Sequence, residues 1–335
     1  MARRRSLSRH VVAPAAVAIA LTLTATGCVD SSNSSAPSPA ASADGSTTAS
    51  PSPTSEPTEA TEQATVSADD ALAALETQYG ARLGVFAVDT GTGATLSWRG
   101  DDRFAYASTH KALSAAALLR EVGVAGLDDP VTINAADIVS YSPVTEQHVG
   151  GTLTLRELAA ASVQQSDNTA ANLVMERLGG PAAFDAALED LGDTVTEAVR
   201  LEPELNEATP GDTRDTTTPH AFANDLHAYF LGGTLGADGL GILTGWMTNS
   251  ATGDSLIRAG APIDWIVADK SGAASYGTRN DIAVLWPPGG APIVMAVMSS
   301  RDSIGADADP NADPDAEYND ALIADATREV MAVLR

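Results

Sequence analysis

The chain has 335 residues, a formal net charge of -25 at pH 7 and 44% hydrophobic residues. This apolar content is enough for a sizeable core. The acidic balance argues against nucleic acid as a partner, because phosphate binding requires a basic face. The chain contains a single cysteine, which excludes an internal disulfide.

The first 27 residues have the layout of an export signal. A basic start (MARRRSLSRH) precedes an apolar run (VVAPAAVAIALTL) that is too short to span a membrane, and small residues lead to Cys28. The ending ATGC resembles a bacterial lipobox, in which Cys28 is lipidated. We therefore expect a signal peptide at 1–27 and an exported protein, lipid-anchored through Cys28 to the outer face of the cytoplasmic membrane and in part released as a secreted form. An ordinary signal peptide cleaved near Cys28 is the alternative.

Residues 28–66 are rich in serine, threonine, alanine, proline and glutamate and show no apolar period. Such a segment cannot bury enough surface to offset the entropy of ordering. We expect a disordered tether over 28–66 that holds a globular domain clear of the membrane. The folded domain is expected over 67–335, where SADD (67–70) resembles a capping box ahead of a helix over 71–80.

Strand patterns lie at both ends of this domain, and helical patterns fill its middle. Strands are expected at 82–90, 94–99, 262–272, 279–288 and 291–300. Helices are expected at 104–119, 154–165, 168–180, 181–192, 220–233, 240–249 and 319–334, with Thr154 and Glu157 in capping-box spacing. We therefore expect one α+β domain, with an antiparallel sheet built from both chain ends, flanking helices and a helical lobe.

Ser108 precedes Lys111 by three residues at the start of an alanine-rich run. Residues three apart share a helix face. Burial lowers the pKa of a lysine, and the neutral amine could then activate a serine nucleophile. His110 is also near, but its spacing places it on a different helix face. Because this short motif is common by chance, a serine N-cap is the alternative.

Two further motifs follow in order. SDN (166–168) lies at the junction of two helical segments, and KSG (270–272) ends a strand pattern. Ser166 could relay a proton to a leaving nitrogen, and Lys270 could offer a cation to a substrate carboxylate. Gly272 would let the strand edge approach a ligand, so that the amide of Ala273 joins that of Ser108 in an oxyanion hole. Taken singly, SDN could be a helix cap and Lys270 a solvated strand end.

Glu202 and Asn206 are four residues apart in a polar stretch from 200 to 219. One helical turn, for which Pro203 suits the first position, would bring both side chains to one face. A carboxylate beside an amide can hold and deprotonate a water molecule. A polar surface loop is the alternative, and Glu204, on another face, is expected to be a solvated charge.

In this order, S-x-x-K, S-D-N and K-[TS]-G form the motif set of serine β-lactamases and penicillin-binding proteins. The stretch from 200 to 219 strongly resembles the omega loop of class A β-lactamases. Similar motifs are YSPVTE (141–146), SDNTAANL (166–173), RDTTTP (214–219), DKSG (269–272) and YGTRNDIAV (276–284). By these motifs the chain resembles a class A serine β-lactamase in lipoprotein form.

The resemblance implies hydrolysis of β-lactam antibiotics through a serine acyl-enzyme, and hence antibiotic resistance. Ser108 would be the acylated nucleophile, Lys111 and Glu202 would share its activation, and Ser166 would relay the proton. Glu202 and Asn206 would position the water that cleaves the ester. The substrate would be bound by Asn168, Lys270, Ser271, Gly272, Ala273, Arg279 and Tyr141.

The resemblance also implies that Arg200 and Asp215 pin the omega loop. Neither a cofactor nor a metal is expected, because the histidines show no metal-ligand spacing. The expected partner is a small-molecule β-lactam, with membrane contact only through the lipid anchor and a monomer as the default.

Two other functions share part of this pattern. A D-alanyl-D-alanine carboxypeptidase or transpeptidase has the same three motifs but releases its acyl group from β-lactams slowly. A non-catalytic lipoprotein that binds cell-wall peptide or another partner would have no need of the serine, lysine and glutamate together. The pair of Glu202 and Asn206 favours the β-lactamase, because rapid release of a stable ester needs an activated water.

Overall fold

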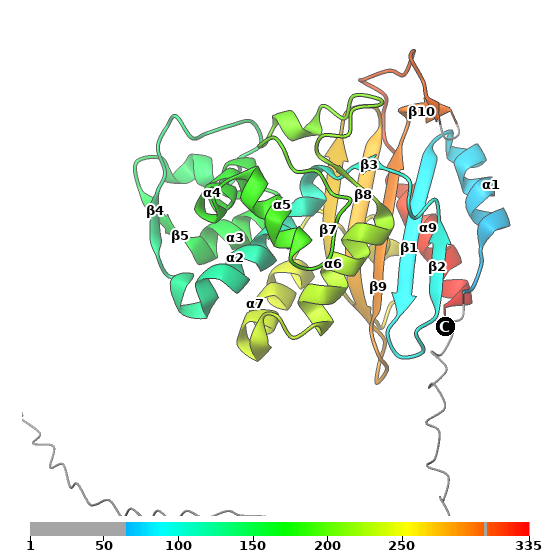
Figure 1. Ribbon diagram of the computed structural model, residues 1–335, viewed down its shortest axis with the longest axis horizontal. Coiled ribbons are helices and arrows are strands. Elements are labelled where there is room, and N and C mark those ends of the chain that lie inside the picture. Colours follow the sequence, from blue (N-terminus) through cyan, green and yellow to red (C-terminus); the bar gives the residue numbers. More distant parts are fainter. Residues whose placement is uncertain (1–64, 305–306, 335) are drawn as a thin grey trace, which may run out of the picture. The chain divides into compact units, whose positions relative to one another are not determined.

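The computed structural model describes residues 65–304 and 307–334 (Figure 1). The predicted signal peptide, Cys28 and the predicted tether up to residue 64 lie outside these residues. Thr65 and Val66, which the sequence analysis assigns to the tether, both pair with Thr95, so paired structure begins two residues before the predicted domain start. In the part of the chain that the structure describes, no helix has the length and apolar character needed to span a bilayer.

A five-stranded antiparallel sheet joins the two ends of the domain, as predicted. In spatial order its strands are β2 (Thr95–Trp98), β1 (Arg82–Asp89), β9 (Ile293–Ser300), β8 (Thr278–Trp286) and β7 (Ile266–Ala274). Val85 of β1 lies opposite both Trp98 of β2 and Val297 of β9, so the first and the last strand of this sheet in chain order lie side by side. Strand β9 is buried along its whole length, because helices cover both faces of the sheet.

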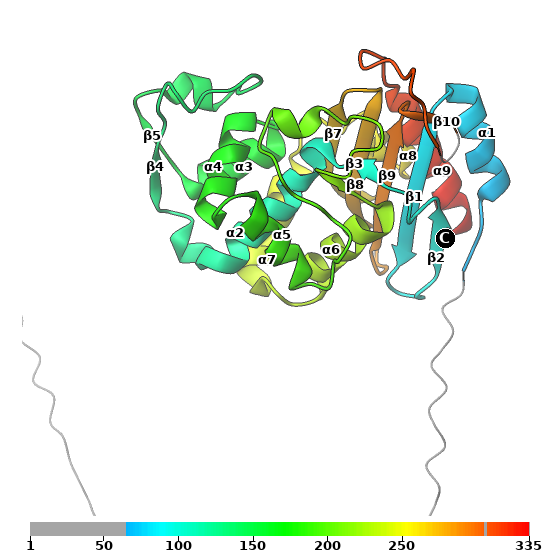
Figure 2. The same cartoon turned by 45° about the horizontal axis from the view of Figure 1, so that its top comes forward.

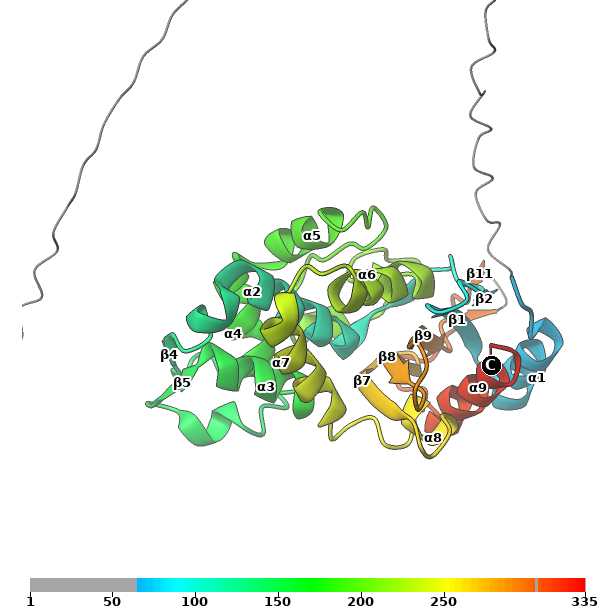
Figure 3. The same cartoon turned by 90° about the horizontal axis from the view of Figure 1, so that it is seen from below.

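The helices divide between the two faces (Figure 3). On one face lie α1 (Asp69–Tyr79), α8 (Ile257–Gly260) and α9 (Asp320–Val333). On the other face α6 (Pro219–Leu231) packs against β1, β8 and β9 and connects the sheet to the helical lobe. Two apolar clusters fill these interfaces, one under α1 and α9 and a larger one that continues into the lobe.

The helical lobe lies to one side of the sheet (Figure 2) and is organised around one buried helix. Its helices are α2 (His110–Gly126), α3 (Leu155–Gln164), α4 (Asn168–Leu178), α5 (Pro181–Glu189) and α7 (Gly236–Thr248). Helix α2 packs against each of the other four, and its residues from His110 to Leu119 are all buried. The predicted capping box of Thr154 and Glu157 is confirmed at the start of α3.

Two local predictions are wrong. The helix expected over 104–119 begins only at His110, because β3 (Phe104–Ala105) pairs with β6 (Thr216–Thr217) and a 3-10 turn, η1 (Ala107–Thr109), follows. The capping box expected at SADD does not form, since Ala68 is the N-cap of α1 and makes no side-chain cap bond. The remaining short elements are β4 (Pro130–Thr132), β5 (Thr152–Thr154), η2 (Thr145–His148), η3 (Glu204–Asn206), β10 (Ser303–Ile304) and β11 (Asp307–Ala308).

Candidate active site

Ser108 lies in the tight turn between β3 and α2. The preceding residue, Ala107, has a left-handed backbone with φ of 49°, a strained conformation of the kind found at functional sites. Ser108 is half-buried, and its Oγ accepts a hydrogen bond from Lys111 Nζ at 2.9 Å. The same hydroxyl donates to Glu202 Oε1 at 3.1 Å. The serine therefore has a carboxylate and an ammonium in direct reach, which is the arrangement that an activated nucleophile needs.

Lys111, one helical turn after Ser108, is fully buried. Its Nζ lies 2.9 Å from Glu202 Oε1 and donates to Asn168 Oδ1 at 2.6 Å and to the backbone oxygen of Ser166 at 2.9 Å. Burial lowers the pKa of Lys111, although the carboxylate of Glu202 opposes this effect. The amine is thus placed to exchange protons with its neighbours.

Glu202 is buried at the base of the omega loop. Asn206 Nδ2 donates to its Oε2 at 2.5 Å, so the predicted pair does share one face, through the 3-10 turn η3. Asn172 holds the backbone of Glu202 by bonds of 2.8 Å and 2.9 Å to its carbonyl and amide. Burial alone would raise the pKa of Glu202, but Lys111 and His110 outweigh burial and hold that pKa well below its usual range. Glu202 is therefore an ionised base at neutral pH.

Lys270 enters the site from strand β7. Its Nζ donates to Ser166 Oγ at 3.2 Å and to the backbone oxygen of Ser271 at 2.7 Å. It is fully buried, so the alternative of a solvated strand end does not hold. Burial, and then the ammonium of Lys111, lower the pKa of Lys270 to about 7.

The SDN turn contributes two residues to the site and one to the fold. Asp167 is the N-cap of α4 and accepts from Ala170 N at 2.8 Å, which is the structural role considered for this motif. Ser166, with φ of 56°, presents its hydroxyl between the two lysines. Asn168 faces the site with both polar atoms engaged, since its Nδ2 donates to the backbone oxygen of Ser140 at 2.9 Å and its Oδ1 accepts from Lys111.

Strand β7 approaches the serine turn closely at Gly272. A Cβ on Gly272 would lie 3.1 Å from Thr109 N and 3.1 Å from Tyr106 O, so a side chain here would push the strand away from the turn. Ser271 Oγ donates to Thr252 Oγ1 at 2.7 Å. Arg279 on the neighbouring strand donates to Asp320 at 2.7 Å, which fixes its guanidinium at the cleft.

A cleft of about 390 Å³ opens over these residues. It is lined by nine of the predicted site residues and by two that no motif indicated: Ser108, Tyr141, Ser166, Asn168, Asn206, Ser271, Gly272, Ala273 and Arg279, with Thr252 and Tyr318. The other three predicted residues, Lys111, Glu202 and Lys270, are buried and contact residues of the cleft floor.

Two residues that contact Glu202, Asn172 and His110, were not predicted as site residues from the sequence. Asn172 lies four residues after Asn168 on α4, so helical spacing could have indicated it. His110 was set aside because its spacing placed it on a different helix face from Ser108. The structure brings its Nε2 to 3.6 Å from Glu202 Oε1, since the omega loop packs against the end of the helix.

Comparison with known proteins identifies the family. A family model described as "Beta-lactamase enzyme family" matches residues 67–334. The chain is 50% identical over 265 residues to Beta-lactamase 3 of Bacillus cereus, which covers 79% of this chain and 81% of that protein. It is 52% identical over 260 residues to a β-lactamase of Amycolatopsis lactamdurans, over 78% of this chain and 83% of that one. The chain belongs to the β-lactamase enzyme family.

Solved structures agree with this assignment. The crystal structure of a class A β-lactamase from Clostridium kluyveri matches with a TM-score of 0.75 and 46% identity, over 79% of this chain and 97% of that chain. A halotolerant bacterial β-lactamase matches with a TM-score of 0.74 and 47% identity, over 78% of this chain and 97% of that one. The α+β fold, the class A resemblance and the enzyme class predicted from the sequence are confirmed.

The omega loop of this β-lactamase is fastened at its base by Asp215. This residue is fully buried and forms an ion pair with Arg200. Its Oδ1 also accepts from the backbone amides of Val199 and Arg200 at 2.9 Å each and from the hydroxyl of Tyr106 at 3.1 Å. These bonds hold the segment that carries Glu202 against the serine turn.

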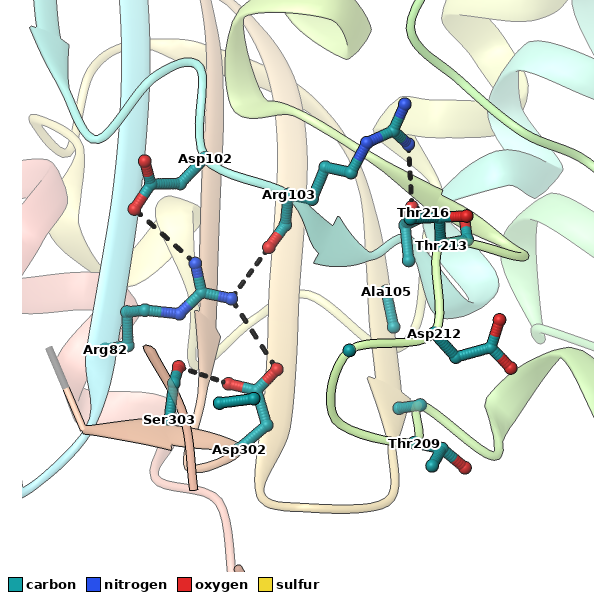
Figure 4. A pocket seen from close by; sticks show the side chains of 13 residues that line it. Arg82, Asp102, Arg103, Ala105, Thr209, Asp212, Thr213, Thr216, Asp302 and Ser303 are labelled. Carbon is teal, nitrogen blue, oxygen red and sulfur yellow. Dashed lines mark hydrogen bonds and ion pairs between the residues drawn. The ribbon is translucent and has the colours of Figure 1, made fainter. Parts of the chain in front are cut away.

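A second cavity of the β-lactamase, of about 320 Å³, lies beside the later part of the omega loop (Figure 4). Arg82 donates to the backbone oxygen of Arg103 at 2.7 Å and pairs with Asp102 and Asp302 at 3.6 Å each. Arg103 donates to Thr216 Oγ1 at 2.9 Å and forms an ion pair with Glu197 at 3.4 Å. Because both arginines are already paired, they connect the sheet edge to the loop rather than offering a free charge to a ligand.

Within residues 65–304 and 307–334, no cluster of histidine, cysteine, aspartate and glutamate is arranged to hold a metal ion. The groups in hydrogen-bond contact with Ser108 Oγ are Lys111 and the carboxylate of Glu202, and Lys270 contacts the neighbouring Ser166.

Proposed function

We propose that this chain hydrolyses β-lactam antibiotics through an acyl-enzyme on Ser108, with a deacylating water activated by Glu202, and so confers resistance. The observation that carries the proposal is the pair of contacts made by the serine hydroxyl. It donates to an ionised carboxylate at 3.1 Å and accepts from a buried ammonium at 2.9 Å. Such a constellation can both generate an ester and supply the base that removes it.

Acylation begins with transfer of the Ser108 proton to Glu202 as Oγ attacks the lactam carbonyl carbon. The amides of Ser108 and Ala273 stabilise the resulting oxyanion. Lys111 then gives a proton to Ser166 Oγ, 3.4 Å from its Nζ, while Ser166 passes its own proton to the lactam nitrogen as the C–N bond breaks. Glu202 returns its proton to Lys111, so both groups end in their starting states.

Deacylation uses the opposite edge of the same carboxylate. Asn206 Nδ2 binds Glu202 Oε2, and Asn206 Oδ1 is buried with no hydrogen-bond partner among the described residues. This pair offers a water molecule an ionised carboxylate as base and an amide oxygen as acceptor. Glu202 takes a proton from the water, the hydroxide attacks the ester carbon, and Ser108 Oγ leaves and takes that proton back from Glu202, which ends ionised as it began.

The substrate carboxylate is assigned to Lys270, Ser271 and Arg279. Two cations at the cleft reverse the field of an otherwise acidic chain, which supports an anionic substrate at this point.

The test is turnover of nitrocefin, a chromogenic cephalosporin, by wild type, Glu202→Ala and Glu204→Ala. Glu204 is exposed in the same turn and is the matched control. We expect steady hydrolysis by wild type and by Glu204→Ala. In Glu202→Ala the carboxylate that opposes the lowering of the Lys111 pKa is gone, so the neutral amine, 2.9 Å from Ser108 Oγ, takes the serine proton and acylation still occurs. No base is left for the water, and we expect a long-lived covalent adduct on Ser108, visible by mass spectrometry. Wild type that binds one equivalent of penicillin and then stalls would favour the carboxypeptidase or transpeptidase instead.

We further propose that the protein is an exported monomer, lipid-anchored at Cys28. The support is the N-terminal pattern of a basic region, an apolar run and the ATGC ending. Replacement Cys28→Ala should release the protein from the membrane fraction with its turnover unchanged. Continued membrane association of that variant would contradict lipidation, and light scattering of the released form tests the monomer.

A further inference from the structure

The imidazole of His110 lies next to the catalytic carboxylate in an aromatic pocket. His110 begins α2 and is 1% exposed. Its ring meets the ring of Tyr106 edge-on at 5.6 Å and the ring of Phe184 at 6.0 Å. Neither ring nitrogen has a hydrogen-bond partner among the described residues. A phenyl ring would suit such surroundings better, because a buried polar group without a partner costs free energy.

The polar group nearest to this ring is the carboxylate of Glu202. His110 Nε2 lies 3.6 Å from Glu202 Oε1, a few tenths of an ångström beyond a hydrogen bond. Oε1 also contacts Ser108 Oγ at 3.1 Å and Lys111 Nζ at 2.9 Å. A small rotation of the carboxylate toward the ring is enough to bring Nε2 into bonding distance.

The surroundings favour a neutral imidazole that donates through Nε2. Burial lowers the pKa of His110, and the ammonium groups of Lys111 and Lys270 act in the same direction against the opposing effect of Glu202. A neutral imidazole carries one N–H, and beside a carboxylate the tautomer with the proton on Nε2 is the favourable one. His110 can therefore restrain Glu202 without adding a second charge to the site.

Acylation changes how Oε1 is held. Once Ser108 is esterified, its Oγ has no proton to donate, and the bond of 3.1 Å to Glu202 is lost. Oε1 then keeps Lys111 and His110, while Asn206 continues to hold Oε2. The contribution of His110 is consequently largest in the step that follows acylation.

We propose that His110 is a positioning residue for deacylation, whose Nε2–H holds Oε1 of Glu202 after Ser108 has been acylated. This inference rests on the proposed function. His110 is absent from the residues that line the cleft, so it acts through Glu202 and not on the substrate.

The experiment compares three variants of the full chain: His110→Phe, His110→Gln and His110→Asn. Phenylalanine keeps the ring and removes the donor, glutamine can place an amide N–H near the position of Nε2, and asparagine places its amide near Nδ1 instead. For each variant, kcat and KM for nitrocefin are measured, together with the fraction of Ser108 acylated during turnover.

We expect kcat of His110→Phe to fall by about tenfold, the size of one lost hydrogen bond to a charged group. KM should fall in parallel and the acylated fraction should rise, because a slower second step affects both. His110→Gln should recover most of kcat, and His110→Asn should behave like His110→Phe. A purely structural role would instead lower the active fraction and the Tm without trapping acyl-enzyme.

Glu202→Ala is measured in the same series. If Glu202→Ala accumulates acyl-enzyme and His110→Phe does not, the inference about His110 is overturned and the proposed function stands. If Glu202→Ala accumulates none, the proposed function itself fails. Should His110→Phe not fold, the glutamine and asparagine variants decide, since equal acylated fractions in these two would refute a role that depends on the place of the donor.

Discussion

The charge of Lys270 makes substrate capture sensitive to pH near neutrality. Burial and the neighbouring Lys111 lower the pKa of Lys270 to about 7, and its ammonium is assigned to the substrate carboxylate. The lysine is charged below this pKa and loses its charge as the pH rises through it. The free enzyme should therefore capture anionic substrate well at pH 6 and poorly at pH 8.

The size of the effect follows from the fraction of charged Lys270. One pH unit below a pKa of about 7 roughly nine-tenths of the groups are protonated, and one unit above it roughly one-tenth. The value of kcat/KM, which reports the free enzyme, should fall about tenfold between pH 6 and pH 8. The alkaline limb of kcat should lie at higher pH, because a bound carboxylate beside the ammonium raises its pKa.

The assay is initial-rate kinetics with nitrocefin from pH 5 to pH 9, with Lys270→Arg measured in parallel. A guanidinium stays charged over this range, so the arginine variant should show no alkaline limb between pH 6 and pH 8, whatever its absolute rate. A wild-type kcat/KM that is constant from pH 6 to pH 8 would refute the reasoning, since either the pKa or the role of Lys270 would be wrong.

Three further predictions concern stability and metal dependence. Burial and then Asp193 raise the pKa of Asp225 to about 9, so the folded state holds a proton that the unfolded state releases near pH 4, and the stability of wild type falls as the pH rises between these values. Asp225→Asn has no such proton to lose. Its unfolding free energy relative to wild type, measured by urea denaturation, should therefore be higher at pH 8 than at pH 5 by at least about 1 kcal/mol. Arg200→Ala leaves the buried carboxylate of Asp215 unpaired and should lower the unfolding free energy by about 3 kcal/mol, whereas Arg214→Ala, which breaks an exposed pair, should cost less than about 1 kcal/mol. Treatment with EDTA should leave nitrocefin turnover unchanged, and a loss restored by added metal would contradict the mechanism.

The sequence predicted the sheet well because its strands are long apolar runs bounded by turn residues. It failed where a distant segment decides the local structure. Phe104 and Ala105 continue into an alanine-rich run, and local propensity favours a helix there. They form a strand because Thr216 and Thr217 pair with them from the omega loop, and such a contact leaves no periodic signal near residue 104.

The same limit applies to the site. The spacing of Ser108 and Lys111 and of Glu202 and Asn206 predicted which side chains meet, because three or four residues along one turn suffice for contact. Spacing could not predict that Lys111, Glu202 and Lys270 would be buried together, since their burial comes from elements far apart in the chain. The contact of His110 with Glu202 was not predicted for a related reason: the position of a residue on a helix face does not indicate which distant loop packs against it.

The position of Glu202 decides which of the two lysines is more easily neutralised. Ser166 Oγ lies 3.4 Å from Lys111 Nζ and 3.2 Å from Lys270 Nζ, so the two ammonium groups repel each other across one hydroxyl. Lys111 has the carboxylate of Glu202 at 2.9 Å. Among the described residues Lys270 donates to a hydroxyl and a backbone oxygen, and the carboxylates of Asp281 and Asp269 oppose the lowering of its pKa without an ion pair to it. The repulsion is therefore relieved by loss of the proton of Lys270, while Lys111 keeps the proton that the proposed acylation step transfers to Ser166. One carboxylate in this position can thus serve as the base for water and also set the order in which the site loses its charges.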